Sequence, residues 1–162
     1  MNTPNLDELI TDFVIQNKEH YYRLAFHYVK NKEDALDVVQ ESIIKALSKK
    51  ASLESPELLK TWFYRIVVNT SIDLLRKQKR LVIVDDEVLT SLDAGNLDQY
   101  TDFDLKNTLD SLPVQYRSII ILRYFSDFKL EEIAKILDEN LNTVKTRLYK
   151  ALSILRIEMN VN

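Results

Sequence analysis

The chain of 162 residues contains no cysteine, a single glycine and three prolines. The absence of cysteine excludes disulfide bonds and thiolate metal sites. Because glycine and proline mark tight turns, their scarcity argues against a hairpin-rich β architecture and predicts long helices. No apolar run approaches the roughly 20 residues that span a bilayer, and the first ten residues lack the basic-then-apolar order of a signal peptide. We therefore expect a cytoplasmic helical protein without membrane insertion.

Charge is segregated along the chain, although hydrophobic residues (46%) and charged residues (29%) stand at ordinary levels for a globular protein. Residues 59–80 hold six basic residues and one acid, whereas residues 85–104 hold seven acids and no base. The net charge of −3 argues against a nonspecific nucleic-acid coat. The local distribution of charge is therefore more informative than the total.

The segment 129–152 predicts a helix, a tight turn and a second helix. Two sets of apolar residues have helical spacing, and the polar run 138–140 separates them. The second helix carries a polar and basic face opposite its apolar seam: Asn142, Thr143, Lys145, Thr146, Arg147, Tyr149 and Lys150. Such a face can bond to base edges and phosphates in a major groove. The alternative is an ordinary helical hairpin with a solvated basic face.

The N-terminal third predicts three helices. Residues 5–29 read as two helices with a break near Asn17, and Asn31 is a good N-cap for a third. The third helix is expected to bury one face: Ala35, Val38, Val39, Ser42, Ile43, Ala46 and Leu47. Its other face presents Asp34, Asp37, Gln40, Glu41 and Lys45. Clustered carboxylates can serve acid–base chemistry or a di-metal site, but a solvated or partner-binding face is the better interpretation.

A long helix is expected from about Glu57 to Gln78, after the break at Ser52, Ser55 and Pro56. Its inward stripe is Leu59, Phe63, Ile66, Thr70 and Leu74, and a neighbouring stripe is Trp62, Arg65, Asn69, Asp73 and Arg76. An aromatic ring beside Arg and Asn, followed by Lys77, Lys79 and Arg80, suits single-stranded nucleic acid. The alternative, which the helix alone leaves equally open, is that Trp62 belongs to the core and the basic tail caps the helix.

Residues 81–104 lack periodicity and read as an acidic, flexible linker in which the apolar tetrad 81–84 could add a short strand. The predicted organisation is therefore all-α, with two small helical domains, 1–80 and 105–162, joined by this linker. In the second domain Pro113 can open a helix, and Val114, Ile119–Leu122 and Tyr124 make that helix strongly apolar. The helix-turn-helix follows it.

Taken together, five segments of the chain resemble a bacterial RNA polymerase sigma factor of the extracytoplasmic-function (ECF) group, and they occur in that family's order. The segments are 33–41, 61–69 with 73–76, 109–113, 131–134 and 143–148. The resemblance implies that Asp34, Asp37, Gln40 and Glu41 bind polymerase. It implies that Trp62, Arg65, Asn69, Arg76, Lys77 and Arg80 bind the promoter −10 element, and that residues Asn142 to Lys150 named above bind the −35 element. The implied partners are core polymerase, through its β′ clamp helices and β flap, promoter DNA and an anti-sigma factor. The implied context is an envelope or stress response.

Four positions depart from the family pattern. Asp127, Asp138 and Asn142 stand where the family usually has glycine, and Lys129 stands where it has a capping serine. Asp and Asn tolerate left-handed backbone, so the turns are expected to survive. Lys129 has no capping side chain, and Asp127 is expected to take that role.

Three other functions compete with this interpretation. A stand-alone helix-turn-helix regulator would explain residues 105–157 but not the two N-terminal motifs. A helical enzyme using the carboxylates, or a metal held by His20 and His27, would need ligands or a nucleophile–base pair that the sequence does not supply. A structural adaptor would bind another protein without polymerase. We expect no enzyme activity, no cofactor and no metal.

Overall fold

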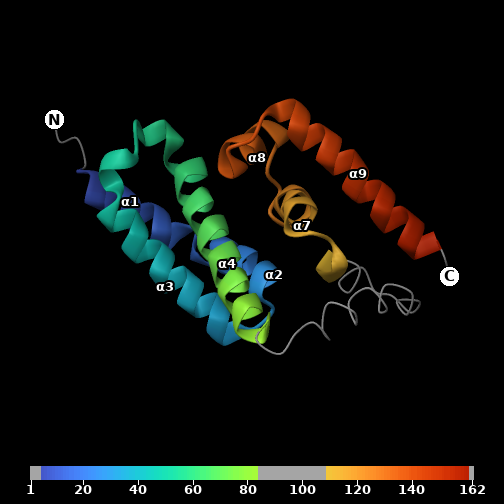
Figure 1. Ribbon diagram of the computed structural model, residues 1–162. Coiled ribbons are helices and arrows are strands. Elements are labelled where there is room, and N and C mark those ends of the chain that lie inside the picture. The colour runs from blue at the N-terminus through green and yellow to red at the C-terminus, as the bar shows by residue number, and fades with distance from the viewer. Residues whose placement is uncertain (1–4, 84–108, 161–162) are drawn as a thin grey trace. The chain divides into compact units, whose positions relative to one another are not determined.

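The computed structural model describes residues 5–83 and 109–160, with side chains over 5–79 and 109–156. The described residues divide into two compact units, 5–75 with 134–138, and 76–83 and 109–133 with 139–160. Every regular element in the described ranges is helical (Figure 1). The predicted all-α class with two small helical domains is confirmed.

Four helices lie within residues 5–83. Their bounds are α1 Leu6–Gln16, α2 Lys18–Val29, α3 Lys32–Ser48 and α4 Leu59–Ile83, with short 3-10 turns at Lys50–Ser52 and Pro56–Leu58. The predicted break lies at Asn17, whose backbone N–H closes α1 on the Phe13 carbonyl. Asn31 caps α3 as predicted, because its side-chain oxygen accepts a 2.8 Å hydrogen bond from the Asp34 N–H. Local capping chemistry therefore sets these helix ends.

The core of this unit is built around the aromatic side chains of α4. The buried Phe63 ring meets Phe13 of α1 and Tyr21 of α2 edge to face, at centroid distances of 5.7 and 5.1 Å. Such T-shaped pairs add to the free energy of apolar burial. The buried Tyr64 hydroxyl is hydrogen-bonded to Nδ1 of His20. Burial, and secondarily the neighbouring Tyr21, raises the pKa of Tyr64, so its hydroxyl stays protonated.

Helix α3 buries a narrower face than its pattern predicts. Ala35, Val38, Ser42 and Ala46 are buried as expected, and Val39 and Ile43 are half-buried. The prediction for Leu47 is wrong, because this side chain is 39% exposed. Helices α1 and α2 both pack against α3. Their contact covers the centre of the apolar stripe and leaves its edge in solvent.

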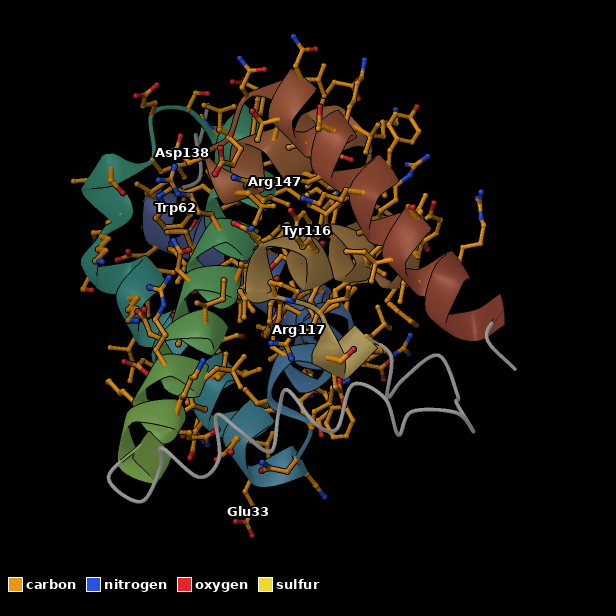
Figure 2. The ribbon with its side chains drawn as sticks, turned by 45° about the vertical axis from the view of Figure 1, so that its right-hand side comes forward. Glu33, Trp62, Tyr116, Arg117, Asp138 and Arg147 are labelled. Atoms are coloured by element: carbon orange, nitrogen blue, oxygen red, sulfur yellow. The ribbon has the colours of Figure 1, made fainter. Side chains whose placement is uncertain are left out.

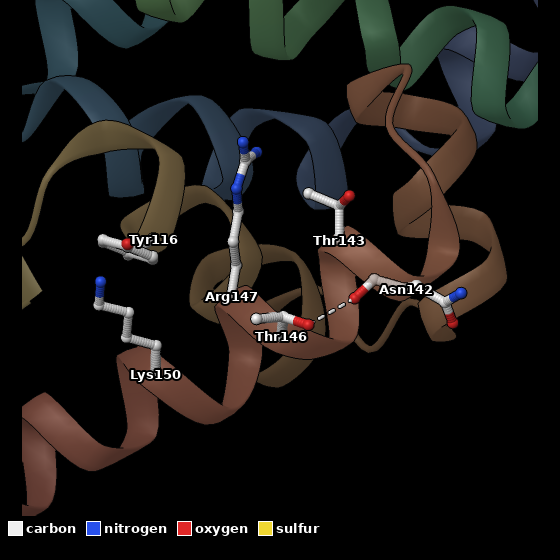
Figure 3. Close-up of a pocket in the computed structure, with 6 residues that line it drawn as sticks. All are labelled: Tyr116, Asn142, Thr143, Thr146, Arg147 and Lys150. Atoms are coloured by element: carbon white, nitrogen blue, oxygen red, sulfur yellow. Dashed lines mark hydrogen bonds between the residues drawn. The ribbon is translucent and has the colours of Figure 1, made fainter.

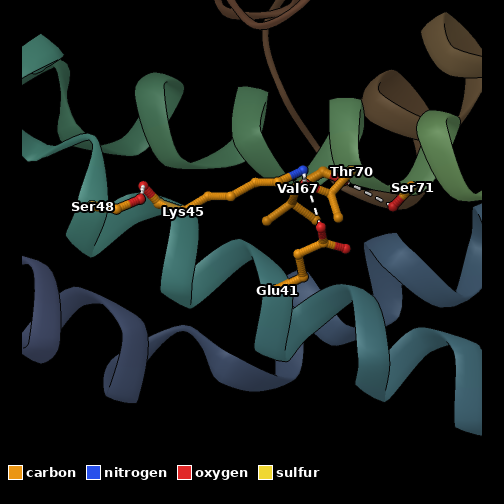
Figure 4. A network of polar contacts seen from close by, with 6 residues as sticks. All are labelled: Glu41, Lys45, Ser48, Val67, Thr70 and Ser71. Atoms are coloured by element: carbon orange, nitrogen blue, oxygen red, sulfur yellow. Dashed lines mark hydrogen bonds and ion pairs between the residues drawn. The ribbon is translucent and has the colours of Figure 1, made fainter.

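Lys45 ties α3 to α4. Its ammonium donates a 3.1 Å hydrogen bond to the buried Thr70 hydroxyl and lies 3.6 Å from a Glu41 carboxylate oxygen (Figure 4). Thr70, predicted on the inward stripe of α4, is therefore buried and bonded. Lys45 thus does not belong to a freely solvated face, although the sequence pattern placed it there.

Helix α4 is longer than predicted and ends at Ile83 instead of near Gln78. The first three residues of the apolar tetrad 81–84 continue the helix, so a strand there is excluded. The predicted linker from 84 onward lies outside the described residues.

In the C-terminal part of the described chain, Pro113 holds the N-cap position of α7, Val114–Ile120. A π-helical turn, Ile121–Phe125, follows, and then α8, Leu130–Leu137, and α9, Leu141–Asn160. Ile119–Leu122 are buried as predicted, but Tyr124 is 52% exposed and that prediction is wrong. The π turn is wider than an α turn, so it rotates the following side chains out of the α-helical register.

The helix-turn-helix is confirmed, and two of its turn residues have left-handed backbone. Asp127 and Asp138 have φ angles of 58° and 54°. They hold two of the three positions where the family usually has glycine, and the third, Asn142, is helical. Lys129 occupies the N-cap position of α8: its carbonyl accepts from the Ile133 N–H, and its own N–H donates a 3.0 Å bond to the Glu132 carboxylate. Glu132, and not Asp127, therefore supplies the side-chain half of the cap.

Ser42 and Ser71 provide a matched test of this packing. Both are buried, but the Ser42 hydroxyl has no partner among the described residues, whereas Ser71 donates a 2.8 Å bond to the Val67 carbonyl. Each change to alanine gains the same helix propensity. We expect Ser42→Ala to be more stable than Ser71→Ala by about 1 kcal/mol. Urea unfolding followed by circular dichroism measures the difference, and equal midpoints would show that the Ser42 hydroxyl is satisfied in solution.

Candidate nucleic-acid interface

Helix α9 separates an apolar seam from a polar face. Val144, Leu148, Ala151 and Leu155 are buried. On the outer side, the predicted residues Asn142, Lys145, Thr146, Tyr149 and Lys150 are exposed, and Thr143 and Arg147 are half-buried. Tyr149 is 70% exposed. The structure therefore places all seven predicted residues on the accessible part of one helix.

The start of this face is fixed by local hydrogen bonds. The Asn142 N–H donates a 2.7 Å bond to the Asn140 side-chain oxygen, which caps the helix. The Thr146 hydroxyl donates a 2.9 Å bond to the Asn142 carbonyl one turn earlier (Figure 3). The Thr146 hydroxyl thus donates its hydrogen bond within the helix, and its oxygen can still accept one. The first two turns are preorganised for a ligand.

The basic residues of α9 are in different environments. Arg147 lies 3.2 Å from a Glu139 carboxylate oxygen, and its side chain is 27% exposed. Lys145 is exposed, and within the described ranges its side chain makes no hydrogen bond or ion pair. Lys150 lies over the ring of Tyr116, with its ammonium 5.6 Å from the ring centroid. Of these three groups, Lys145 is therefore the one most readily available to a phosphate or a base.

Tyr116 also belongs to this surface, although the sequence pattern did not identify it. It projects from α7 into the open groove lined by Asn142, Thr143, Thr146, Arg147 and Lys150 (Figure 3). The apolar pattern of α7 marks Tyr116 only as one more helical residue. No sequence signal connects it to a lysine on another helix.

The predicted −10 residues lie on the solvent side of α4. Arg65, Asn69, Arg76 and Lys77 are exposed, and Trp62 is half-buried. The Trp62 indole N–H donates a 3.0 Å bond to the Ser52 hydroxyl, which fixes the ring at the edge of the core. Trp62 is thus neither fully core nor fully free. The backbone of Arg80 belongs to α4, but its side chain lies outside the described set.

The predicted polymerase-binding residues lie on the outer face of α3. Asp37, Gln40 and Glu41 are exposed, while the Asp34 carboxylate accepts a 2.7 Å bond from the Asn31 amide. Figure 2 shows Glu33 pointing outward from the first turn of the same helix. This surface also has an apolar part that the sequence pattern did not identify: Leu36 and Ile44 are 42% and 67% exposed. A surface that mixes exposed leucine and isoleucine with carboxylates is typical of a protein interface.

The metal hypothesis gains no support from the described residues. Within 5–79 and 109–156, no group of three or more His, Cys, Asp or Glu side chains could hold a metal ion. Likewise, no described helix is long and apolar enough to cross a membrane.

The two parts of the chain match two family descriptions. Residues 13–81 match sigma-70 region 2, and residues 102–155 match sigma-70 region 4. These two matches together define the class, the sigma-70-type transcription initiation factors.

Individual relatives narrow the class. The chain is 55% identical over 151 residues to the RNA polymerase sigma factor SigV of Bacillus subtilis, covering 93% of this chain and 91% of that protein. It is 30% identical to the ECF sigma factor SigW of the same organism, covering 94% and 89%. The chain belongs to the ECF group of RNA polymerase sigma factors. Such factors bind core polymerase and promoter DNA and direct promoter-specific transcription initiation.

A solved structure supports the fold. The sigma factor RpoE of Bartonella quintana, crystallised with the anti-sigma factor NepR, superposes with a TM-score of 0.70 at 24% sequence identity. That match covers 94% of this chain and 97% of the solved one. At this identity the likeness bears on the fold alone.

Arg147 and Lys145 should differ in their effect on stability. We expect Arg147→Ala to lower the free energy of unfolding by about 1 kcal/mol, because it removes both a partly buried ion pair and the packing of the arginine stem. Lys145→Ala should leave stability within about 0.5 kcal/mol of the original chain. Thermal unfolding of the two variants measures the difference. If both variants unfold at the same temperature, the Arg147–Glu139 pair contributes nothing to the fold.

Proposed function

We propose that three exposed faces of this sigma factor have separate tasks. The face of α3 with Asp34, Asp37, Gln40 and Glu41 docks on the β′ clamp helices of core polymerase. The face of α4 with Trp62, Arg65, Asn69, Arg76, Lys77 and Arg80 binds the −10 element. The polar face of α9 enters the major groove at the −35 element, with the second domain on the β flap. The observation that supports this proposal is that the described side chains of all three faces are exposed or half-buried.

Each face has chemistry suited to its task. The Trp62 ring, held at the edge of α4 by Ser52, offers a surface on which an unstacked base can lie, and the exposed Asn69 amide follows about two helical turns later. Unstacking a base costs a few kcal/mol, which such stacking offsets. On α9, Lys145 and the amide of Asn142 are exposed and can bond to base edges.

The proposed setting follows from the relatives. We propose that the protein acts in the cytoplasm, where bacterial polymerase is found, in an envelope or stress response. An anti-sigma factor is a further proposed partner, since the solved relative from Bartonella quintana is bound to one. A stand-alone helix-turn-helix regulator is disfavoured, because it leaves the match of residues 13–81 to sigma-70 region 2 unexplained.

In-vitro transcription with purified bacterial core polymerase tests the proposal. The full chain is added to core polymerase on a library of promoter fragments, and starts are mapped with and without it. Protein-dependent starts that share two upstream sequence blocks support the proposal and identify both elements. Duplex binding without polymerase-dependent starts would instead support the stand-alone regulator.

Asp37→Ala should weaken binding to core polymerase by about fivefold, because it removes a charged contact at a protein interface. Fluorescence anisotropy of the labelled chain titrated with core polymerase measures the affinity. Asp12→Ala, which removes an exposed carboxylate from α1, serves as the matched control and should bind normally. An equal loss in both variants would assign the effect to net charge instead of to the α3 face.

Lys145→Ala should lower transcription from the mapped promoter by about 5- to 150-fold, the range expected for loss of one specific base contact. The same variant is then tested on a template whose −35 block has been replaced. There the loss should disappear, because the contact no longer has its base. A loss of the same size on both templates would show that Lys145 does not read the −35 sequence.

A further inference from the structure

The Tyr116–Lys150 pair joins the helix before the helix-turn-helix to the outer face of α9. Helix α7 packs against α9, and the Lys150 ammonium lies 5.6 Å from the centroid of the half-buried Tyr116 ring. A cation within about 6 Å of a ring centroid is attracted by the electron-rich face of the ring. Tyr116 therefore restricts where the lysine points.

The two exposed lysines of α9 lie at different edges of the helix. Each residue advances an α-helix by about 100°, so Lys145 and Lys150 point about 140° apart. Helix α7 lies beside the edge that carries Lys150, and Tyr116 contacts the lysine there. A helix in a major groove has a sugar–phosphate backbone along each side. Each lysine is thus placed to approach a different backbone or groove wall.

The groove around the pair has the chemistry of a phosphate site. None of its six lining residues is acidic, and they offer the Lys150 ammonium, the Arg147 guanidinium and the hydroxyls of Tyr116 and Thr143 (Figure 3). The nearby Glu139 carboxylate is paired with Arg147, which lowers the local positive charge and leaves Lys150 as the main cation. A free lysine stem loses much rotamer freedom when it binds, and a ring that already holds it reduces that loss.

We propose that Tyr116 is a positioning residue of the −35 interface: its ring holds the Lys150 ammonium toward a backbone phosphate of the duplex. The interface thereby extends beyond the helix-turn-helix onto α7. This inference rests on the proposed function of α9. The competing explanations are that Tyr116 contacts DNA by itself, or that it only packs α7 against α9.

A double-mutant cycle separates these explanations. Tyr116→Leu, Lys150→Gln and the double variant are prepared in the full chain, and the affinity of each holoenzyme for the mapped promoter is measured. Tyr116→Leu should weaken binding about 2- to 5-fold, the range for an exposed cation–ring contact. In the Lys150→Gln background the same change should have no further effect. Tyr116→Phe, which keeps the ring and removes the hydroxyl, should bind the promoter as tightly as the original chain.

The salt dependence of binding tests the phosphate. Lys150→Gln should reduce the slope of log affinity against log salt by about 0.9, the value for one lost phosphate contact. An unchanged slope would overturn the assignment of Lys150 to the DNA backbone. Thermal unfolding of each variant accompanies these measurements. If Tyr116→Leu unfolds, Tyr116→Gln replaces it in the cycle.

The outcomes of the cycle are distinct. Equal losses from Tyr116→Leu in both backgrounds overturn the positioning role, and failure of Tyr116→Phe to restore binding assigns the effect to the hydroxyl. A wild-type chain that directs no polymerase-dependent starts overturns the proposed function itself. Active wild-type protein with additive variants overturns only the Tyr116 inference.

Discussion

The edge-to-face packing of Phe63 is the constraint on which the first unit depends. Phe13 and Tyr21 approach this ring from two different helices, and they fix the rotation of α4 about its own axis. At about 100° per residue, positions two, six and thirteen residues further along point about 200–240° away from Phe63. Those positions hold Arg65, Asn69 and Arg76, which are exposed. A change that loosened the ring would therefore disturb the proposed −10 face without touching any residue on it.

Helical periodicity explains why so much was predictable from the sequence. The seam at Val144 and Leu148 dictates which residues of α9 face outward, and the Asn31 cap dictates where α3 begins. The left-handed backbone at Asp127 and Asp138 was expected from the resemblance, because these residues stand where the family usually has glycine and Asp tolerates that conformation. Each of these features depends on local chemistry. The order of motifs then supplied the family.

Features that depend on distant partners or on the width of a contact were not predictable. The apolar stripe of α3 includes Leu47, but this side chain is 39% exposed, whereas the neighbouring Ala46 is fully buried. Tyr124 continues the apolar pattern of α7, yet the π turn shifts it into solvent. The Lys45–Thr70 and Tyr116–Lys150 pairs each join two helices far apart in the sequence, and nothing in either local pattern marks the partner. Such pairs also decide which polar residues of a face remain available.

The environments of three cations on the polar face of α9 bear on why a factor of this class works with polymerase. Arg147 is paired with Glu139, Lys150 is held over Tyr116, and Lys145 has no recorded partner within the described ranges. Sequence-independent DNA affinity grows with the number of phosphates neutralised. In a chain of net charge −3, a carboxylate beside Arg147 keeps that number low. We infer that α9 supplies discrimination between sequences more than affinity, and that core polymerase supplies the remaining attraction to DNA.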